Sequence, residues 1–310
     1  MFYYSLLILL LLSLTCKCQY DRARMIEGAS KLRKLPLLDV CGLSRIDIGT
    51  RIINGKPAKL GAYPWMALVG YRRQSGRRTM WGCGGSLVTN QHVVTAAHCG
   101  YSPILDGYNV YEVRLGDLDM NDTIYDGAYP LDFGVESFTI HEHYDNKKKV
   151  NDVAIIKIKG KVQFTDLIRP ICLPPPEFRT NMFVDFAPVA AGWGVSVNNT
   201  AFRTDTRLLE AELTIQDLDE CRTNVTTKLT DVQIDDSVIC AYSPTSDTCQ
   251  GDSGGPLMFP KTLSRSVNTT GNMFLMGIVS YGYMCALPGF PSVYTRVAHH
   301  MAWIVEHLDV

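Results

Sequence analysis

Short apolar runs separated by glycine, proline, asparagine and aspartate dominate the chain after Arg51. Five of these runs are Trp65–Val69, Ser86–Val88, Val93–Thr95, Val153–Ile156 and Met276–Val279. Brief apolar segments bounded by turn-forming residues are typical of the strands of a β-sandwich or a β-barrel. The pattern therefore predicts an all-β structure over residues 52–310. Periodicity alone leaves open whether this stretch forms one β domain or two packed barrels.

The C-terminus follows a different period. Apolar side chains recur there at helical spacing, at Val297, Met301, Ile304 and Leu308. Residues three or four apart lie on one face of an α-helix, so these four side chains form one apolar stripe. We expect a single amphipathic helix at the end of an otherwise β-rich chain.

The N-terminus carries an apolar run of another kind, Leu6–Leu12, which is too short to span a bilayer. Its position, followed by the small residues Cys16 and Cys18, is typical of a secretory signal peptide cleaved before Gln19. No basic side chain precedes the run, so the amino group of Met1 supplies the positive charge. We expect residues 1–18 to be a signal peptide, the protein to be secreted, and no other segment to cross a membrane.

Secretion changes the meaning of the cysteines, because disulfides persist in an oxidising compartment. The chain has ten cysteines, and ten minus Cys16 and Cys18 leaves eight, an even number. Four Asn-x-Thr sequons, candidate glycosylation sites, agree with an extracellular protein. They begin at Asn121, Asn198, Asn224 and Asn268.

Charge and patterning set the remaining organisation. A formal net charge of −1 points to neither nucleic acid nor an anionic membrane as a partner. Residues 19–51 are basic and weakly patterned, hold one cysteine, Cys41, and show no convincing helix or strand. We therefore expect three regions: a signal peptide (1–18), a pro-segment (19–51) and a β-rich domain (52–310).

Three short segments carry candidate chemistry. Thr95–Cys99 places His98 beside a cysteine whose disulfide would fix its backbone, and Asn151–Ile155 puts Asp152 at the edge of an apolar strand. Gly251–Pro256 sets Ser253 in a glycine-rich turn, where successive N–H groups can converge on an oxyanion. Taken singly, such a histidine or aspartate is usually structural. Together they supply a nucleophile, a base and a carboxylate that orients the base, whatever their order in the chain.

On these segments the chain resembles the chymotrypsin–trypsin family of serine proteases, from Arg51 to about Leu308. Arg51–Gly55 and Val293–Val297 extend the match. The resemblance implies two perpendicular six-stranded antiparallel β-barrels with a C-terminal α-helix, and an active site in the cleft between the barrels. It also implies that residues 52–310 are a trypsin-like serine protease domain.

The same resemblance assigns catalytic roles. Ser253 is then the nucleophile of a serine endopeptidase, His98 the general base and later acid, and Asp152 its orienting partner. The backbone N–H groups of Gly251 and Ser253 form the oxyanion hole. Ser280 matches the residue that hydrogen-bonds the carboxylate of the triad.

Resemblance further implies a zymogen. Arg51-Ile52 is the bond that a trypsin-like activator would cut, and Arg51 then ends the activation pro-segment. The freed ammonium of Ile52 would enter the interior and pair with Asp252. Because an unpaired buried charge costs roughly 3–5 kcal/mol, this pairing is strong enough to order the oxyanion loop.

Specificity is expected at the base of the substrate pocket. Asp247, six residues before Ser253, would pair with a substrate Arg or Lys, and this carboxylate argues against a chymotrypsin-like preference. The other implied pocket residues are Ser280, Gly282 and Ser292. Three positions depart from the family pattern: Ser292 and Met284 replace glycines and Tyr281 replaces a tryptophan. A serine in the wall would narrow the pocket, so the preference between Arg and Lys stays open.

The implied disulfides tie these parts together, although eight cysteines alone permit many connectivities. They are Cys83–Cys99, Cys221–Cys240, Cys249–Cys285 and Cys41–Cys172. The last pair would keep the cleaved pro-segment attached to the protease. The amino-acid sequence of the chain most resembles those of arthropod clip-domain and venom serine proteases. A clip domain needs more cysteines than Cys41, so we expect a short pro-peptide without one, and haemolymph cascades, digestion and venom all stay open as roles.

Expected partners are a protein or peptide substrate, an upstream trypsin-like activating protease and a protein inhibitor such as a serpin, with no nucleic acid and no membrane. The alternative from another class is a non-catalytic protease homologue that serves as a binding partner or cascade cofactor. Such homologues usually lack the nucleophile or the base, and Ser253 and His98 are both present.

No cofactor is required for this chemistry. Ca²⁺ is nevertheless a candidate, because some family members bind it in the loop where this chain is rich in carboxylates, which suit that ion. The loop residues are Asp117, Asp119, Asp122, Asp126 and Asp132. His141 and His143 flank a glutamate, but such a sequence in a loop is usually solvated, and we expect no metal there.

Overall fold

The computed structural model describes residues 35–45, 56–74, 76–100, 107–174, 187–194, 206–244, 251–261, 271–283 and 289–309. Several expectations lie outside these residues: the signal peptide, the Arg51-Ile52 bond, Asp247, Met284, the Cys249–Cys285 pair and two sequons, Asn198 and Asn268. The chain divides into two compact units. The larger, Pro36–Met301, contains the candidate site and every strand of the described residues, and the smaller contains Ala302–Val310.

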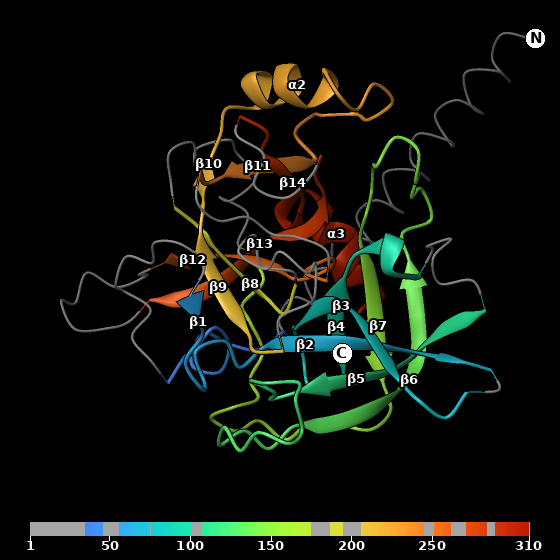
Figure 1. Ribbon diagram of the computed structural model, residues 1–310, viewed down its shortest axis with the longest axis vertical. Helices are drawn as coiled ribbons and strands as arrows, with labels where there is room; N and C mark the ends of the chain where they lie inside the picture. The colour runs from blue at the N-terminus through green and yellow to red at the C-terminus, as the bar shows by residue number, and fades with distance from the viewer. Residues whose placement is uncertain are drawn as a thin grey trace, which may run out of the picture. The chain divides into compact units, whose positions relative to one another are not determined.

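Six strands of the larger unit form a closed antiparallel barrel in the order β2-β3-β4-β7-β6-β5 (Figure 1). Their bounds are β2 (Met66–Arg73), β3 (Met80–Leu87), β4 (His92–Thr95), β5 (Tyr108–Leu115), β6 (Leu131–Ile140) and β7 (Ala154–Ile158). The apolar runs Trp65–Val69 and Val153–Ile156 are buried along their whole length. Burial of these runs explains their nearly continuous apolar sequence, because barrel strands that are covered by other chain segments need no polar face.

A second set of strands forms an eight-stranded antiparallel sheet in the order β1-β9-β8-β12-β13-β14-β11-β10. Its strands are β1 (Lys56–Pro57), β8 (Val189–Gly192), β9 (Leu209–Glu212), β10 (Thr214–Ile215), β11 (Val238–Tyr242), β12 (Pro256–Lys261), β13 (Asn272–Tyr281) and β14 (Ser292–Arg296). The all-β class is therefore confirmed. The expected count of six strands is exceeded in this sheet because the two-residue strands β1 and β10 pair along its two edges.

Two α-helices and one short 3₁₀ helix are present among the described residues: η1 (Ala97–Gly100), α2 (Leu218–Thr226) and α3 (Val297–His307). The predicted C-terminal helix is confirmed as α3. Helix α2 was not anticipated, although Asp217 accepts hydrogen bonds from the N–H groups of Asp219 and Glu220 and so caps its start. No helix in the described part of the chain is both long enough and apolar enough to cross a membrane.

Three disulfides lie within the described residues, and they are three of the pairs that the family resemblance implied. They are Cys41–Cys172, Cys83–Cys99 and Cys221–Cys240. Cys83–Cys99 ties β3 to η1, and Cys221–Cys240 ties α2 to β11. These links fix a local helix against a strand in both cases.

The segment around Cys41, which we expected to belong to a pro-segment, is anchored to the rest of the chain. The N–H of Gly42 donates to the carbonyl of Pro170 at 2.8 Å, and its own carbonyl accepts from the N–H of Met273 at 2.9 Å. The Asn272 amide donates to the carbonyls of Leu38 and Cys41 at 2.6 and 2.8 Å. Gly42 has φ +66°, and a Cβ there would lie 2.4 Å from the Met273 carbonyl oxygen. Backbone contacts as well as the disulfide therefore hold residues 38–42 on β13.

Candidate active site

His98 lies on η1, directly after the buried strand β4. The next residue, Cys99, is fixed by its disulfide to Cys83 and by a hydrogen bond of 2.8 Å from the Tyr71 hydroxyl to its carbonyl. Both contacts come from neighbouring barrel strands. The short helix therefore presents the His98 ring from a rigid support.

Asp152 is only 1% exposed and contacts His98 at two points. Its Oδ1 accepts the backbone N–H of His98 at 2.9 Å, and its Oδ2 lies 2.8 Å from His98 Nδ1. The Ser280 hydroxyl donates to the same Oδ2 at 2.5 Å. Asn151, just before it, has φ +55°, a left-handed conformation that asparagine tolerates better than most residues. The carboxylate is thereby aimed at both the backbone and the ring of one histidine.

Opposing effects act on the pKa of the Asp152 carboxyl. Burial raises it, whereas the charge of His98 and the hydrogen bonds from His98 and Ser280 lower it, and the net shift is below the ordinary value. The side chain is therefore ionised at neutral pH. An ionised carboxylate against Nδ1 favours the tautomer that keeps a proton there and leaves Nε2 free to accept one.

Ser253 is placed against the barrel by its own turn, which precedes β12. The Ser253 carbonyl oxygen accepts a hydrogen bond from the N–H of Gly84 on β3 at 2.7 Å. The same oxygen lies 3.7 Å from the Sγ atom of Cys99, the residue that follows His98. Gly254 has φ +79°, and a Cβ there would lie 2.2 Å from Thr95 Oγ1. Only glycine fits this approach. The turn therefore holds the Ser253 backbone against β3 and against Cys99, the residue that follows His98.

Gly251 and Asp252 complete the turn. Gly251 has φ +102°, a conformation that L side chains rarely adopt. Asp252 is 8% exposed, and its Oδ1 accepts the N–H of Gly194 at 2.7 Å. A Cβ on Gly192 or Gly194 would lie 1.9 or 2.3 Å from the Asp252 carboxylate. The Asp252 carboxylate thus occupies space that any side chain at position 192 or 194 would fill, so both positions require glycine.

The expected pocket residues Gly282 and Ser292 face each other. A Cβ on Gly282 would lie 3.1 Å from Ser292 Oγ, and Ser292 is buried. Tyr281, on the adjoining position of β13, pairs with Val293 of β14. Burial raises the pKa of Tyr281 above its ordinary range, so its hydroxyl stays neutral at physiological pH.

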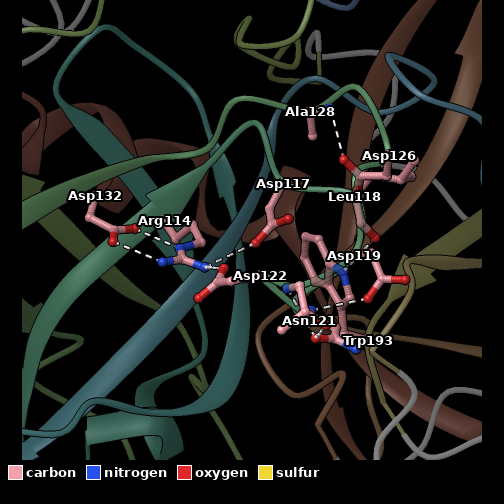
Figure 2. Close-up of polar contacts among 11 residues, drawn as sticks. Arg114, Asp117, Leu118, Asp119, Asn121, Asp122, Asp126, Ala128, Asp132 and Trp193 are labelled. Atoms are coloured by element: carbon pink, nitrogen blue, oxygen red, sulfur yellow. Dashed lines mark hydrogen bonds and ion pairs between the residues drawn. The ribbon is translucent and has the colours of Figure 1, made fainter.

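The acidic loop is organised around Arg114, as Figure 2 shows. Arg114 Nε and Nη2 donate to Asp132 at 2.7 and 3.0 Å, and its Nη1 lies 3.1 Å from Asp122 and 3.4 Å from Asp117. Asp119 accepts the N–H of Asn121 at 3.0 Å, and Asp126 accepts that of Ala128 at 2.8 Å. The carboxylates do not fit the Ca²⁺ site considered above, because a guanidinium stands among three of them.

The histidine pair is not arranged as a metal site either. His141 and His143 have ring centroids 6.0 Å apart, and His141 Nδ1 accepts the N–H of His143 at 3.1 Å. Within the described residues, the one group of three or more closely spaced ligand atoms is that of Cys83, His98 and Cys99. Its two sulfurs already form a disulfide, so they offer no thiolate to a metal.

Two contacts of the site escaped the sequence analysis. Thr295 of β14 donates its hydroxyl to the carbonyl of Asp152 at 2.8 Å, and Gly194 holds Asp252. Thr295 lies within the motif Val293–Val297, yet spacing alone links it to no catalytic segment. A third residue, His300, lies with its ring centroid 5.6 Å from His141, and its Nε2 is buried without a hydrogen-bond partner.

Comparison with known proteins agrees with this geometry. The family model described as "Trypsin" matches residues 52–304. The chain is 41% identical over 277 residues to the "Proclotting enzyme" of Tachypleus tridentatus, which covers 88% of this chain and 70% of that protein. It is 41% identical over 255 residues to the "Venom protease" of Bombus pensylvanicus, which covers 81% of this chain and 96% of that protein. The "CLIP domain-containing serine protease B4" of Anopheles gambiae is 34% identical over 303 residues, 93% of this chain and 79% of that protein.

The fold and the site define a serine endopeptidase. The chain belongs to the trypsin family, and its similarity to arthropod clip-domain and venom serine proteases confirms the expectation drawn from its motifs.

Proposed function

We propose that the protein is a secreted zymogen that is activated by cleavage after Arg51 and then hydrolyses peptide bonds after Arg or Lys. The observation that carries the proposal is the two-point contact of Asp152 with His98, at 2.9 Å to the backbone N–H and 2.8 Å to Nδ1. Such a contact fixes both the position and the tautomer of the imidazole. A purely structural histidine has no need of both.

In the proposed mechanism, Ser253 Oγ attacks the carbonyl carbon of the scissile bond while His98 Nε2 takes its proton. The developing oxyanion is stabilised by the N–H groups of Gly251 and Ser253. His98 then donates the proton to the leaving amine, which leaves an acyl-enzyme on Ser253. Water, deprotonated by His98, releases the acid product and regenerates the serine. Asp152 stays ionised throughout and stabilises the imidazolium.

Activation is proposed to act through Asp252. Cleavage frees the ammonium of Ile52, and its pairing with the buried Asp252 carboxylate orders the turn that carries Gly251 and Ser253. The proximity of Asp252 to Gly194 supports this role, because the carboxylate is already withdrawn from solvent beside the oxyanion turn. The Cys41–Cys172 disulfide then keeps the pro-segment on the protease.

Specificity for Arg or Lys is proposed to rest on Asp247, with Gly282 and Ser292 as the walls of the pocket. The names of the relatives support a role in an extracellular proteolytic cascade, in which another trypsin-like protease is the activator. An extracellular protein inhibitor such as a serpin would then limit the activity. Carbohydrate on Asn121 and Asn224 suits the same compartment, because α2 leaves Asn224 partly exposed.

The test is hydrolysis of a peptide amide with Arg at the cleaved position by the purified precursor, before and after controlled cleavage at Arg51. We expect activity to appear only after cleavage and to fall by several orders of magnitude in Ser253→Ala. Ser237→Ala is the matched control, because Ser237 is buried and its hydroxyl donates to Asp235, outside the proposed triad. No activity after verified cleavage, on substrates with Arg, Lys or aromatic residues, would favour a non-catalytic protease homologue instead.

A further inference from the structure

The turn between β2 and β3 concentrates positive charge. Arg73, Arg77 and Arg78 are exposed there, and within the described residues no carboxylate lies within ion-pair distance of any of them. Arg72 is different, because its Nη2 lies 3.4 Å from Glu112 and its charge is matched. Three unmatched guanidiniums on one turn stand out in a chain whose formal net charge is −1. We call the described residues of this turn, 72–74 and 76–80, the basic hairpin.

Two tyrosines of β5 stack with the two arginines at the base of the basic hairpin. The Arg72 guanidinium lies 3.8 Å from the Tyr111 ring centroid, and that of Arg73 lies 4.8 Å from the Tyr108 ring centroid. Strands β2 and β5 are paired here, with Arg73 opposite Tyr108 (Figure 1). Stacking on aromatic rings restricts where a guanidinium can point. The charges at the base of the hairpin are therefore held in place.

Strand β3 runs from the basic hairpin to a residue that hydrogen-bonds the proposed nucleophile. This strand begins at Met80 and reaches Gly84, whose N–H donates to the Ser253 carbonyl at 2.7 Å. Four residues of extended strand span about 13 Å. A bound polypeptide a few residues longer than the segment in the active site therefore reaches both places at once.

The chemistry of the surface favours a polypeptide partner. Guanidiniums form paired hydrogen bonds with carboxylates, so acidic side chains match Arg73, Arg77 and Arg78. Tyr111, which stacks with Arg72, is 45% exposed, and Met80, at the end of the hairpin, is 39% exposed, so both offer apolar surface as well. A sulfated polysaccharide would satisfy the charges but would leave this apolar surface unmatched.

We propose that the basic hairpin is a secondary binding site for an acidic segment with aromatic residues in the protein substrate, outside the segment that is cut. The proposal rests on the proteolytic function proposed above. Its effect is to lower the KM for substrates that carry such a segment, because the second contact holds the scissile bond near Ser253. Short substrates without the segment gain nothing from it.

Kinetics test the proposal with three fluorogenic peptides that share one Arg-containing cleavage sequence. One has no tail, and the others carry an Asp-Glu-Phe-rich tail beyond either the amino or the carboxyl side of the cut. We expect one tailed peptide to be cleaved with a KM about tenfold lower than that of the untailed peptide, an advantage that shrinks in high salt. The variant Arg73→Glu/Arg77→Glu/Arg78→Glu should lose this advantage and cleave the untailed peptide normally.

The matched control reverses the same number of charges elsewhere, at the exposed residues Lys159, Lys161 and Lys228. This control should keep the tail advantage. An advantage that is equal in both triple variants, or absent for both tails, would overturn the proposal. Thermal melting of each variant separates loss of binding from loss of folding.

Direct binding separates this proposal from the proteolytic one. The fluorescently labelled tail alone should bind the cleaved Ser253→Ala protein, and the basic-hairpin variant should bind it at least tenfold more weakly, whether or not the parent enzyme cleaves peptides. Heparin is the competing ligand in the same assay. Binding of heparin with no binding of the acidic peptide would overturn the proposal in favour of a polysaccharide.

Discussion

Thr295 donates its hydroxyl to the backbone carbonyl of Asp152 at 2.8 Å, and both groups are buried. Thr295 belongs to β14 of the sheet, whereas Asp152 lies two residues before the start of β7 in the barrel. The bond therefore fixes the carboxylate that orients His98 from the opposite assembly of strands. Removing it should affect the alignment of the site as well as the stability of the fold.

Thr295→Val keeps the shape of the side chain and removes the donor. A buried carbonyl without its partner costs about 1–3 kcal/mol, so we expect the free energy of unfolding to fall by that amount and kcat to fall severalfold. Denaturant unfolding and peptide hydrolysis measure the two effects. Thr295→Ser is the control, since it retains the hydroxyl. Equal kcat values for the valine variant and the parent would mean that the bond has no part in positioning Asp152.

Gly194→Ala probes the space around Asp252. The new Cβ would lie 2.3 Å from Asp252 Oδ2, so the carboxylate must move and the oxyanion turn with it. We expect kcat/KM to fall by about 10²-fold, the scale of losing one oxyanion donor. Gly134→Ala is the control, because Gly134, like Gly194, lies outside the positive-φ region, and a Cβ there would come no closer than 3.3 Å to the flexible Lys159 side chain. A normal kcat/KM in Gly194→Ala would argue against the role proposed for Asp252.

His300 makes stability depend on pH. Burial, with the neighbouring His299 and His141, lowers its pKa to about 3, although Asp152 and Asp235 act in the opposite direction. Because the folded-state pKa lies below the ordinary 6.5, the neutral form stabilises the fold above pH 6.5, and this contribution is lost as pH falls toward 3. We expect a loss of roughly 2 kcal/mol between pH 6.5 and pH 5.

Replacement of His300 by leucine removes the titrating group, so its unfolding free energy should vary less with pH in that interval. His299→Gln, at a more exposed neighbouring histidine, should keep most of the parental pH dependence. The measurement is denaturant unfolding at several pH values. Parallel pH curves for the leucine variant and the parent would show that His300 is not the group responsible.

The Cys41–Cys172 disulfide predicts how the activated molecule behaves on a gel. After cleavage at Arg51, we expect two fragments that migrate together without reductant and separate with it. In Cys41→Ser/Cys172→Ser, the backbone bonds of Gly42 remain but the covalent link is lost. The pro-segment should then dissociate under denaturing, non-reducing conditions. Persistent comigration in this variant would point to another linkage.

Much of the fold and the site was accessible from the sequence. The apolar runs predicted strands because each is buried along the barrel or sheet, and the spacing from Val297 to Leu308 predicted α3. The segments around His98, Asp152 and Ser253 predicted the chemistry because each couples one reactive side chain to a local backbone feature. Each of these signals lies within a few neighbouring residues, so it can be recognised in the sequence without knowledge of the fold.

Other features depend on contacts that no local pattern records. Thr295 meets Asp152 across the two strand assemblies, and Gly194 meets Asp252 across 58 positions of the chain. The edge strands β1 and β10 are too short to leave a periodic signal. Helix α2 is a different failure, because its N-cap Asp217 was visible but its apolar residues are few. The acidic loop was interpreted by composition, and composition does not reveal that Arg114 lies among its carboxylates.

Arg114 gives the acidic loop a countercharge that is part of the polypeptide. A guanidinium keeps its charge at any pH that the folded protein meets, and no chelator can withdraw it. The loop from Asp117 to Asp132 should therefore keep its arrangement whatever the Ca²⁺ concentration around the protein. The countercharge of these carboxylates is a side chain and not a bound ion. EDTA should therefore leave the melting temperature of the protein unchanged, whereas Arg114→Met should lower it.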